Sequence, residues 1–309
     1  MNFYKNGNYV VCIADDGTKI RSTKDDEFIP DFAENCDVKI TDKCDGRCPF
    51  CYEGCTENGK HADLFSYKFI ETLHPYTELA LNGNDLSHPQ IEDFLKFLKE
   101  KKVYTNLTVN QKHFMLHFNK LKNWTDEKLI YGLGVSLNNV NAEFIENVKQ
   151  FPNAVIHTIN GILDKESIEK LANNNLKVLI LGYKDLRRGI TYKETHSSII
   201  KDNQKMLYEN LKQIIDNKMF DVVSFDNLAI TQLDVKRLFD NNDDWDRFYM
   251  GDDGNFTFYI DMVDGYYSKN SLSQERYKIG EKTIDEIANE YAKNFTSWYE
   301  KLTVNPDKE

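Results

Sequence analysis

The chain has 309 residues, of which 29% are charged and 13% are aromatic, a composition typical of a folded protein rather than a disordered one. Its net charge of −11 repels phosphate backbones and anionic lipid, so we expect neither nucleic acid nor a membrane as a partner. The sequence has no run of 18 apolar residues, and its start lacks the layout of a signal peptide. We therefore expect a cytoplasmic protein.

The first segment, residues 1–35, predicts a small N-terminal β-hairpin. Two short extended runs, 8–13 and 18–21, are joined by Asp15, Asp16 and Gly17, and an Asp-Gly step between such runs is a hairpin signal. We expect this segment to lie as an appendage against the main domain.

A regular alternation of strands and helices follows. We expect strands at 37–41, 78–81, 104–109, 131–137, 154–159 and 177–181, and helices at 64–73, 91–98, 113–121, 142–151 and 164–173. Short strands that alternate with helices are typical of βαβ units and a parallel sheet. Six such units predict an α/β fold, a partial (βα)6 TIM-like barrel, which we place at residues 36–225.

The pattern becomes less regular after Gly182. We expect a long helix at 202–218, a seventh strand at 221–225, a polar break at 241–244 and a strand at 256–262. A terminal amphipathic helix is predicted from the spacing of Ile284, Ile287, Ala288, Tyr291, Phe295, Trp298 and Leu302. No linker rich in Pro, Gly or Ser interrupts the chain, so residues 226–309 are predicted to be an extension of strand and helix packed on the barrel.

Five of the six cysteines fall between positions 36 and 55, which indicates metal binding rather than disulfides in a chain of this length. Cys44, Cys48 and Cys51 are spaced so that one loop could wrap an iron–sulfur cluster or a zinc ion, both of which favour thiolate ligands. Three thiolates would leave one iron of a [4Fe–4S] cluster without a protein ligand. A structural zinc site with Cys55 or Cys36 as its fourth ligand, or an electron-transfer cluster, remains the alternative.

The motif Cys44-x3-Cys48-x2-Cys51, with Phe50 just before the third cysteine, resembles that of radical S-adenosylmethionine (radical SAM) enzymes. The resemblance covers about residues 36–185 and implies a single [4Fe–4S] cluster that binds S-adenosylmethionine at its open iron. It also implies reductive cleavage of that cofactor to a 5′-deoxyadenosyl radical, hydrogen-atom abstraction from a substrate, the partial barrel, and an electron donor such as flavodoxin or ferredoxin.

The segment Asn82-Gly83-Asn84-Asp85 resembles the Gly-Gly-Glu-Pro segment of that family, which contacts the methionine amino group. It departs from that segment, since Asn82 replaces the first Gly, Asn84 the Glu and Asp85 the Pro. Phe50 is expected against the adenine. Further expected cofactor contacts follow the later strands: Asn110, Ser136, Asn138, His157, Leu181, Lys184 and Arg187. Ordinary loop and turn chemistry is the alternative for this group. In the basic segment after the sixth strand the alternative is a solvated loop, and we expect it for Arg188 more than for Lys184 or Arg187.

Cys55 could donate a hydrogen atom if it faces the cavity, or it could be a small buried residue. For the substrate, we expect a ribosomally made peptide that is crosslinked or epimerised, with a nucleoside or small metabolite as the second possibility. The competing interpretation is a non-catalytic metal-binding protein. The acidic composition favours a Lys-rich peptide, and the edge of the strand at 256–262 could pair with its backbone.

Overall fold

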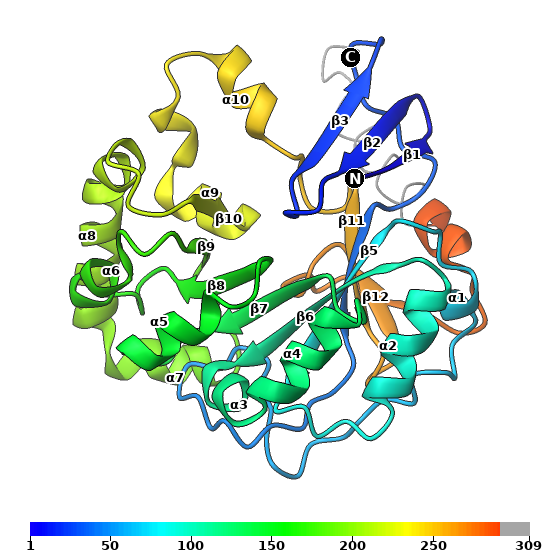
Figure 1. The fold of residues 1–309 in the computed structure, drawn as a ribbon, viewed down its shortest axis with the longest axis horizontal. Coiled ribbons are helices and arrows are strands. Elements are labelled where there is room, and N and C mark those ends of the chain that lie inside the picture. The colour runs from blue at the N-terminus through cyan, green and yellow to red at the C-terminus, as the bar shows by residue number, and fades with distance from the viewer. Residues whose placement is uncertain (291–309) are drawn as a thin grey trace, which may run out of the picture.

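The computed structural model describes residues 1–290. Its centre is a ten-stranded sheet with the strand order β10-β9-β8-β7-β6-β5-β4-β11-β12-β13 (Figure 1). Neighbouring strands are parallel from β10 to β11, and β12 and β13 are added antiparallel. Within the described residues no pairing joins β10 to β13, so the sheet is open and the expected partial barrel is not confirmed.

The strands of this sheet match the predicted alternation closely. They are β4 (Asn35–Lys39), β5 (Glu78–Asn84), β6 (Tyr104–Asn110), β7 (Gly132–Ser136), β8 (Ala154–Ile159), β9 (Lys177–Leu181), β10 (Val222–Phe225), β11 (Thr257–Asp261), β12 (Tyr266–Ser268) and β13 (Tyr277–Lys278). The helices are α1 (Lys68–Glu71), α2 (Ile91–Glu100), α3 (Gln111–Leu116), α4 (Phe118–Asp126), α5 (Ala142–Val148), α6 (Lys165–Leu171), α7 (Arg188–Thr195), α8 (Ser197–Asp216), α9 (Asn227–Leu233) and α10 (Asn242–Phe248), with a 3-10 helix η1 (Val235–Leu238).

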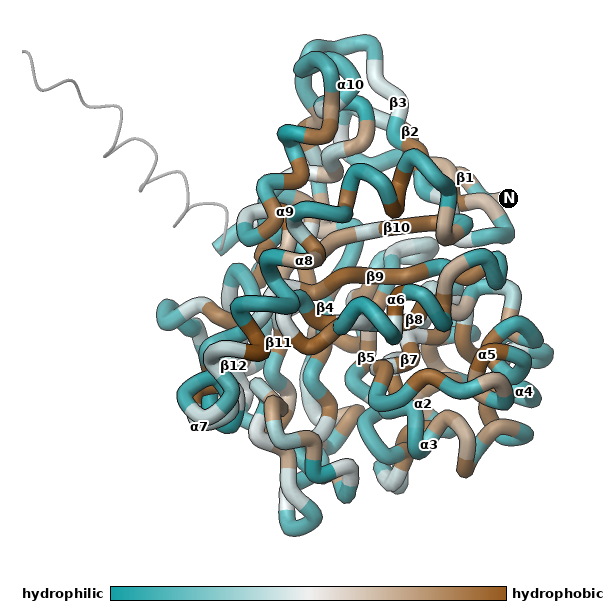
Figure 2. Tube along the Cα trace, turned by 90° about the vertical axis from the view of Figure 1, so that its left-hand side faces the viewer, coloured by the Kyte–Doolittle hydropathy of each residue, from teal (hydrophilic) through white to brown (hydrophobic). Residues whose placement is uncertain are grey.

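The two faces of the parallel strands differ, because side chains alternate between them. In β5, Leu79 and Leu81 are buried against the helices, while Asn82 lies on the opposite, inner face and is only half-buried. The tube coloured by hydropathy shows the consequence, with apolar strands such as β9 and β10 flanked by more polar helices (Figure 2). This inner face, on the side of the sheet away from the helices, carries most of the polar residues of the candidate site described below.

Several predicted boundaries are wrong for local reasons. The helix expected at 64–73 is reduced to α1, and the helix expected at 113–121 is divided at His117 into α3 and α4. The polar break expected at 241–244 instead begins α10, because the Asn241 side chain accepts a hydrogen bond from the Asp244 amide (2.8 Å) and caps the helix. Helix α7 was not predicted at all.

The N-terminal segment forms a three-stranded antiparallel sheet of β1 (Asn2–Asn6), β2 (Tyr9–Ile13) and β3 (Lys19–Thr23). Strands β2 and β3 form the expected hairpin, turning at Gly17 with φ +89°, and β1 is an additional strand. Its inner face, with Tyr9, Val11 and Ile13, packs on Tyr104, Tyr131 and Phe256, which lie at or just before the amino ends of β6, β7 and β11. The small sheet therefore covers the amino-terminal end of the large one (Figure 1).

Glu34 anchors this small sheet. Its carboxylate is fully buried and accepts hydrogen bonds from the Tyr9 hydroxyl (2.5 Å), from Arg21 Nε (2.8 Å) and from Lys19 Nζ (3.3 Å). A buried carboxylate is tolerated only when it is paired and hydrogen-bonded, as it is here. Glu34 directly precedes β4, so the small sheet is fastened to the strand that leads into the cysteines.

The C-terminal extension inserts β11 beside β4, with Tyr259 paired to Asp37 and Asp261 to Lys39. Because β11 lies between β4 and β12, it has no free edge, and the expected pairing of a substrate backbone with this strand is wrong. Residues 284–290 are helical and begin with a capping box, in which Thr283 and Glu286 each accept a hydrogen bond from the other's amide. The rest of the predicted terminal helix, from Tyr291 to Leu302, lies outside the described residues.

Among residues 1–290, no helix is long and apolar enough to cross a membrane.

Candidate cofactor site at the cysteine loop

The three motif cysteines lie on one loop, residues 44–55, that follows β4 at the carboxyl end of the parallel strands; we call it the cysteine loop. Its base is closed by hydrogen bonds from the Cys44 amide to the Thr56 carbonyl (2.9 Å) and from the Thr56 amide to the Asp42 carbonyl (3.0 Å). Gly59 permits this closure, since a Cβ there would lie 2.2 Å from the Asp42 oxygen. The small N-terminal sheet lies at the opposite end of the strands (Figure 1).

Each motif sulfur has a hydrogen-bond donor close by. The Gly46 amide lies 3.3 Å from Cys44 Sγ, and Asn110 Nδ2 lies 3.4 Å from Cys48 Sγ. The Cys55 thiol and backbone donate to the Cys51 sulfur. Donors of this kind stabilise negatively charged sulfur and orient it, which is the usual outer shell of a metal-bound thiolate.

The thiols differ in acidity. Burial raises the pKa of Cys44 to about 11 and also raises the pKa of Cys48. The hydrogen bond from Cys55 lowers the pKa of Cys51, with a further contribution from the Arg188 charge, and the same hydrogen bond with burial raises the pKa of Cys55. Cys51 is thus the thiol that most readily carries the negative charge needed for metal binding.

The donor set fits the iron–sulfur cluster that the motif implies. Three thiols on one loop, each with a nearby hydrogen-bond donor, match the soft-ligand chemistry of such a cluster. Gly46 lies beside the first of them, where a Cβ would come within 3.2 Å of Cys44 Sγ. Within residues 1–290, no group of three or more His, Cys, Asp or Glu side chains is gathered as tightly as a single metal ion requires.

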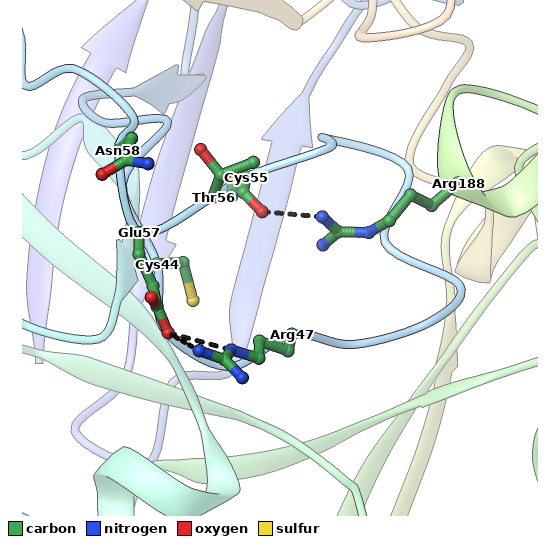
Figure 3. Close-up of a pocket in the computed structure, with 7 residues that line it drawn as sticks. All are labelled: Cys44, Arg47, Cys55, Thr56, Glu57, Asn58 and Arg188. Carbon is green, nitrogen blue, oxygen red and sulfur yellow. Dashed lines mark hydrogen bonds and ion pairs between the residues drawn. The ribbon is translucent and has the colours of Figure 1, made fainter.

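A cavity of about 380 Å³ lies beside the loop (Figure 3). Its lining consists of Cys44, Arg47, Cys55, Thr56, Glu57, Asn58 and Arg188. Arg47 and Glu57 form an ion pair across one side of it, with Nη2 and Oε1 2.6 Å apart. Arg188 enters from the other side and donates to the Cys55 carbonyl.

The last residues of β5 support the cysteine loop with their side chains. Asn82 bonds the Ile40 amide (2.7 Å) and the Thr41 carbonyl (2.9 Å). Asn84, in the left-handed region at φ +50°, directs its amide nitrogen to the Lys43 carbonyl (3.2 Å) and to Cys55 Sγ (3.4 Å).

Asp85 continues this support and accepts from the Asp45 amide (3.2 Å). Gly83 lies between the two asparagines, and a Cβ there would meet a Leu107 methyl group at 2.8 Å. The expected amino-group segment is therefore adjacent to the cysteines, and its polar side chains are bonded to the loop.

The other expected cofactor residues gather at the carboxyl ends of the neighbouring strands. Asn110 ends β6, and its side chain exchanges hydrogen bonds with that of Asn138 (2.8 and 3.2 Å). Ser136 ends β7 and lies opposite His157 of β8 in the strand register. Burial lowers the pKa of His157 to about 4, so this imidazole is neutral at physiological pH. Leu181 ends β9 on the same face.

Phe50 and the basic segment after β9 contact other parts of the protein. The Phe50 ring meets Tyr192 of α7 edge-on, with ring centroids 5.6 Å apart. Lys184 Nζ lies 4.1 Å from the centre of the Tyr52 ring and 3.1 Å from Ser271 Oγ. Arg187 donates to the Glu53 carbonyl.

Arg188 corrects the expectation of a solvated loop residue. Its Nε donates to the Cys48 carbonyl (3.1 Å) and its Nη1 to the Cys55 carbonyl (2.9 Å). Arg187 and Arg188 are adjacent and carry the same charge. The direction of the backbone alone decides which of the two side chains reaches the Cys48 and Cys55 carbonyls. No sequence signal distinguishes them.

Two further supports were also missed. The Gln111 side chain accepts from the Asn138 and Asn139 amides (2.7 and 2.9 Å) and holds the turn after β7. His113 Nε2 lies 2.6 Å from an Asp45 carboxylate oxygen and links α3 to the cysteine loop. Both residues belong to the first turn of α3, directly after Asn110. This position was the only feature of the sequence that could have indicated their role near the site.

Comparison with known proteins shows a likeness at the level of the fold. No protein-family model matches the chain, and no curated protein matches it. Among solved structures, SuiB from Streptococcus suis, determined with S-adenosylmethionine bound, is similar with a TM-score of 0.53 and 14% sequence identity. The likeness covers 85% of this chain and 64% of the SuiB chain, so this chain spans less than two thirds of SuiB. The likeness shows that this chain shares the fold of SuiB.

Proposed function

We propose that this chain is a radical SAM enzyme that holds one [4Fe–4S] cluster on Cys44, Cys48 and Cys51. The observation that carries the proposal is the presence of all three thiols, each beside a hydrogen-bond donor, on one loop at the carboxyl end of β4. With S-adenosylmethionine bound, the cluster would supply the electron that cleaves this cofactor into methionine and the 5′-deoxyadenosyl radical that removes a hydrogen atom from the substrate.

The chain's own residues hold and orient these groups. Amide and thiol donors around the sulfurs favour their anionic form. The row formed by Asn110, Asn138, Ser136 and His157 offers hydrogen-bonding groups for the cofactor's ribose and base at the strand ends. Gly134 keeps the row compact, since a Cβ there would lie 2.5 Å from His157 Cε1.

The segment beside the cysteines and the basic segment complete the proposed cofactor contacts. Backbone groups of the segment Asn82-Gly83-Asn84-Asp85 are proposed to face the methionine amino group. The side chains of Asn82, Asn84 and Asp85 are already hydrogen-bonded to the backbone at or next to the cysteine loop. Leu181, Lys184 and Arg187 are proposed on the opposite side, and Phe50 beside the adenine. Cys55 is buried and is hydrogen-bonded to Cys51 and Asn84. These contacts favour a role in supporting the loop over hydrogen-atom donation to the substrate.

For the substrate, we propose a peptide rich in lysine, modified by crosslinking or epimerisation. Support comes from the net charge of −11, which attracts cationic chains. The Asp37 side chain is exposed although β4 lies between β5 and β11, so this carboxyl group is accessible to such a chain.

The proposal is tested first on the metal. Anaerobically purified protein should contain about four iron and four sulfide per chain, as expected for one cluster of this type. Stoichiometric zinc without sulfide would instead indicate a structural metal site and would contradict the enzyme. Reduced protein mixed with S-adenosylmethionine should then release 5′-deoxyadenosine.

The substrate is tested in the same anaerobic mixture. Lysine-rich and lysine-free peptides of equal length are compared with nucleosides by the yield of 5′-deoxyadenosine and by substrate mass. Loss of two hydrogens indicates a crosslink, and deuterium uptake from the solvent without another change indicates epimerisation. Turnover with nucleosides or small metabolites alone would reject the peptide and leave the radical enzyme intact.

A further inference from the structure

Arg188 differs from Arg47 and Arg187, the other two arginines around the cysteine loop, in forming no ion pair with a carboxylate among the described residues. Arg47 is paired with Glu57, and Arg187 Nη1 lies 3.7 Å from a carboxylate oxygen of Glu53. No Asp or Glu within residues 1–290 forms an ion pair with Arg188, which uses backbone carbonyls instead. Its positive charge beside the thiols is therefore not neutralised by an adjacent side chain.

The two hydrogen bonds of Arg188 join both branches of the cysteine loop. The Cys48 carbonyl precedes Cys51 by three residues, and the Cys55 carbonyl follows it by four. Because a guanidinium is planar and its N–H groups have fixed directions, two such bonds fix the separation of the two branches. Figure 3 shows one of the two, the bond to the Cys55 carbonyl. A residue from α7 thus sets the geometry of the loop more than 130 positions earlier in the chain.

Local backbone geometry directs Arg188 to this position. The preceding Arg187 is in the left-handed region at φ +47°. The following Gly189 lies so close to the preceding turn that a Cβ would be 2.5 Å from the Lys184 carbonyl oxygen. The contact of Phe50 with Tyr192 is a second connection between the loop and α7.

We infer that Arg188 positions the cysteine loop and, through its unpaired charge, raises the reduction potential of the cluster that the loop holds. The inference rests on the proposed function. A cluster gains one negative charge when it accepts an electron, and a nearby positive charge stabilises that reduced form. Since a guanidinium stays protonated at all physiological pH values, its contribution is permanent.

The test is a redox titration of the anaerobically purified, cluster-loaded full chain, followed by electron paramagnetic resonance in the absence of S-adenosylmethionine. Arg188→Gln removes the charge and keeps an N–H donor, Arg188→Met removes both, and Arg188→Lys keeps the charge. At the potential where half of the wild-type clusters are reduced, we expect the reduced-to-oxidised ratio to fall about tenfold in the neutral variants, a shift of about 59 mV for one electron. Arg188→Lys should stay within about threefold of the wild type.

Arg237→Gln is the control for a general loss of positive charge, because Arg237 lies in η1 and stacks on Tyr208 away from the loop. It should leave the potential unchanged. Equal potentials in the wild type and both neutral variants would overturn the inference, and so would an equal fall in Arg188→Lys and Arg188→Gln, because geometry alone would then explain the effect. Two neutral variants are used so that poor folding of one leaves the other to measure. A wild type without any iron–sulfur signal would instead contradict the proposed function itself.

Discussion

The ammonium group of Lys39 lies 3.0 Å from a carboxylate oxygen of Asp261, and both side chains are 2% exposed. Lys39 ends β4, ahead of the cysteine loop, and Asp261 ends β11, so the pair fastens the C-terminal extension to the strand that carries the site. Burial alone would lower the pKa of Lys39, but Asp261, with Glu53 and Asp42, outweighs burial and raises it. The ammonium therefore remains charged inside the fold.

Asp261→Ala should strongly destabilise the protein. Removing one partner of a buried ion pair costs about 3 kcal/mol, because the other charge is left buried. The free energy of unfolding in urea measures the loss. Asp264→Ala, an exposed carboxylate three positions later, is the matched control and should change stability by less than about 0.5 kcal/mol. Similar small losses in both variants would show that the pair contributes little.

His88 should make the fold sensitive to acid. Its Nε2 donates to the Ala62 carbonyl (3.0 Å), its Nδ1 accepts from the Gln90 amide (3.2 Å), and burial lowers its pKa to about 4 from 6.5. Since the folded pKa lies below the unfolded one, this contribution is complete above pH 6.5 and is lost as the pH falls toward 4. We expect a loss of about 2 kcal/mol at pH 5 relative to pH 7. His88→Gln should make the profile less steep over this window, while the buried His157 continues to contribute to it. Parallel profiles in the wild type and the variant would refute the assignment.

Cys44→Ala, Cys48→Ala and Cys51→Ala should each abolish the iron–sulfur absorbance, because each removes an iron ligand. Cys12→Ala should retain it, since Cys12 lies on β2 at the opposite end of the strands. Absorbance spectra and iron content of anaerobically purified protein provide the measurement. Full iron content in Cys44→Ala together with its loss in Cys55→Ala would show that the ligands are assigned incorrectly.

The double substitution of Asn84 and Asp85 by Ala should reduce both cluster content and affinity for S-adenosylmethionine. Both side chains support the cysteine loop. Asn84 donates to the Lys43 carbonyl and to Cys55 Sγ, and Asp85 accepts from the Asp45 amide. Calorimetric titration and iron analysis measure the two effects. Asn106→Ala is the control, since Asn106 bonds Glu78 nearer the other end of the strands. Unchanged values in the double variant would show that the segment does not support the site.

The repeated strands were predictable because their signal is local. Burial alternates along β5, β6 and β8, where most of the buried positions carry apolar residues, and the sequence displays this alternation directly. The pairing of β11 with β4 was not predictable, because it joins segments more than 200 residues apart and no local pattern encodes a partner. For the same reason the open form of the sheet could not be derived from the count of βα units.

The candidate site was predictable to the same extent. Cys44, Cys48 and Cys51 are close in sequence, so their spacing alone brings them together. The role of Arg188 depends on a left-handed Arg187 and on the path of α7, neither of which has a sequence signature here. The segment of Asn82 and Asn84 was expected at the cofactor from its resemblance alone, and the bonds of the two side chains to the cysteine loop depend on the backbone path at the end of β5.

The late position of β11 in the chain has a consequence during synthesis. A ribosome that adds about 5–20 residues per second needs roughly ten seconds or more to travel from β4 to β11, and one edge of β4 lacks its partner throughout. An unpaired strand edge is a template for association with other chains. We therefore expect newly made chains to depend on chaperones that shield this edge, and chains that end before Thr257 to aggregate.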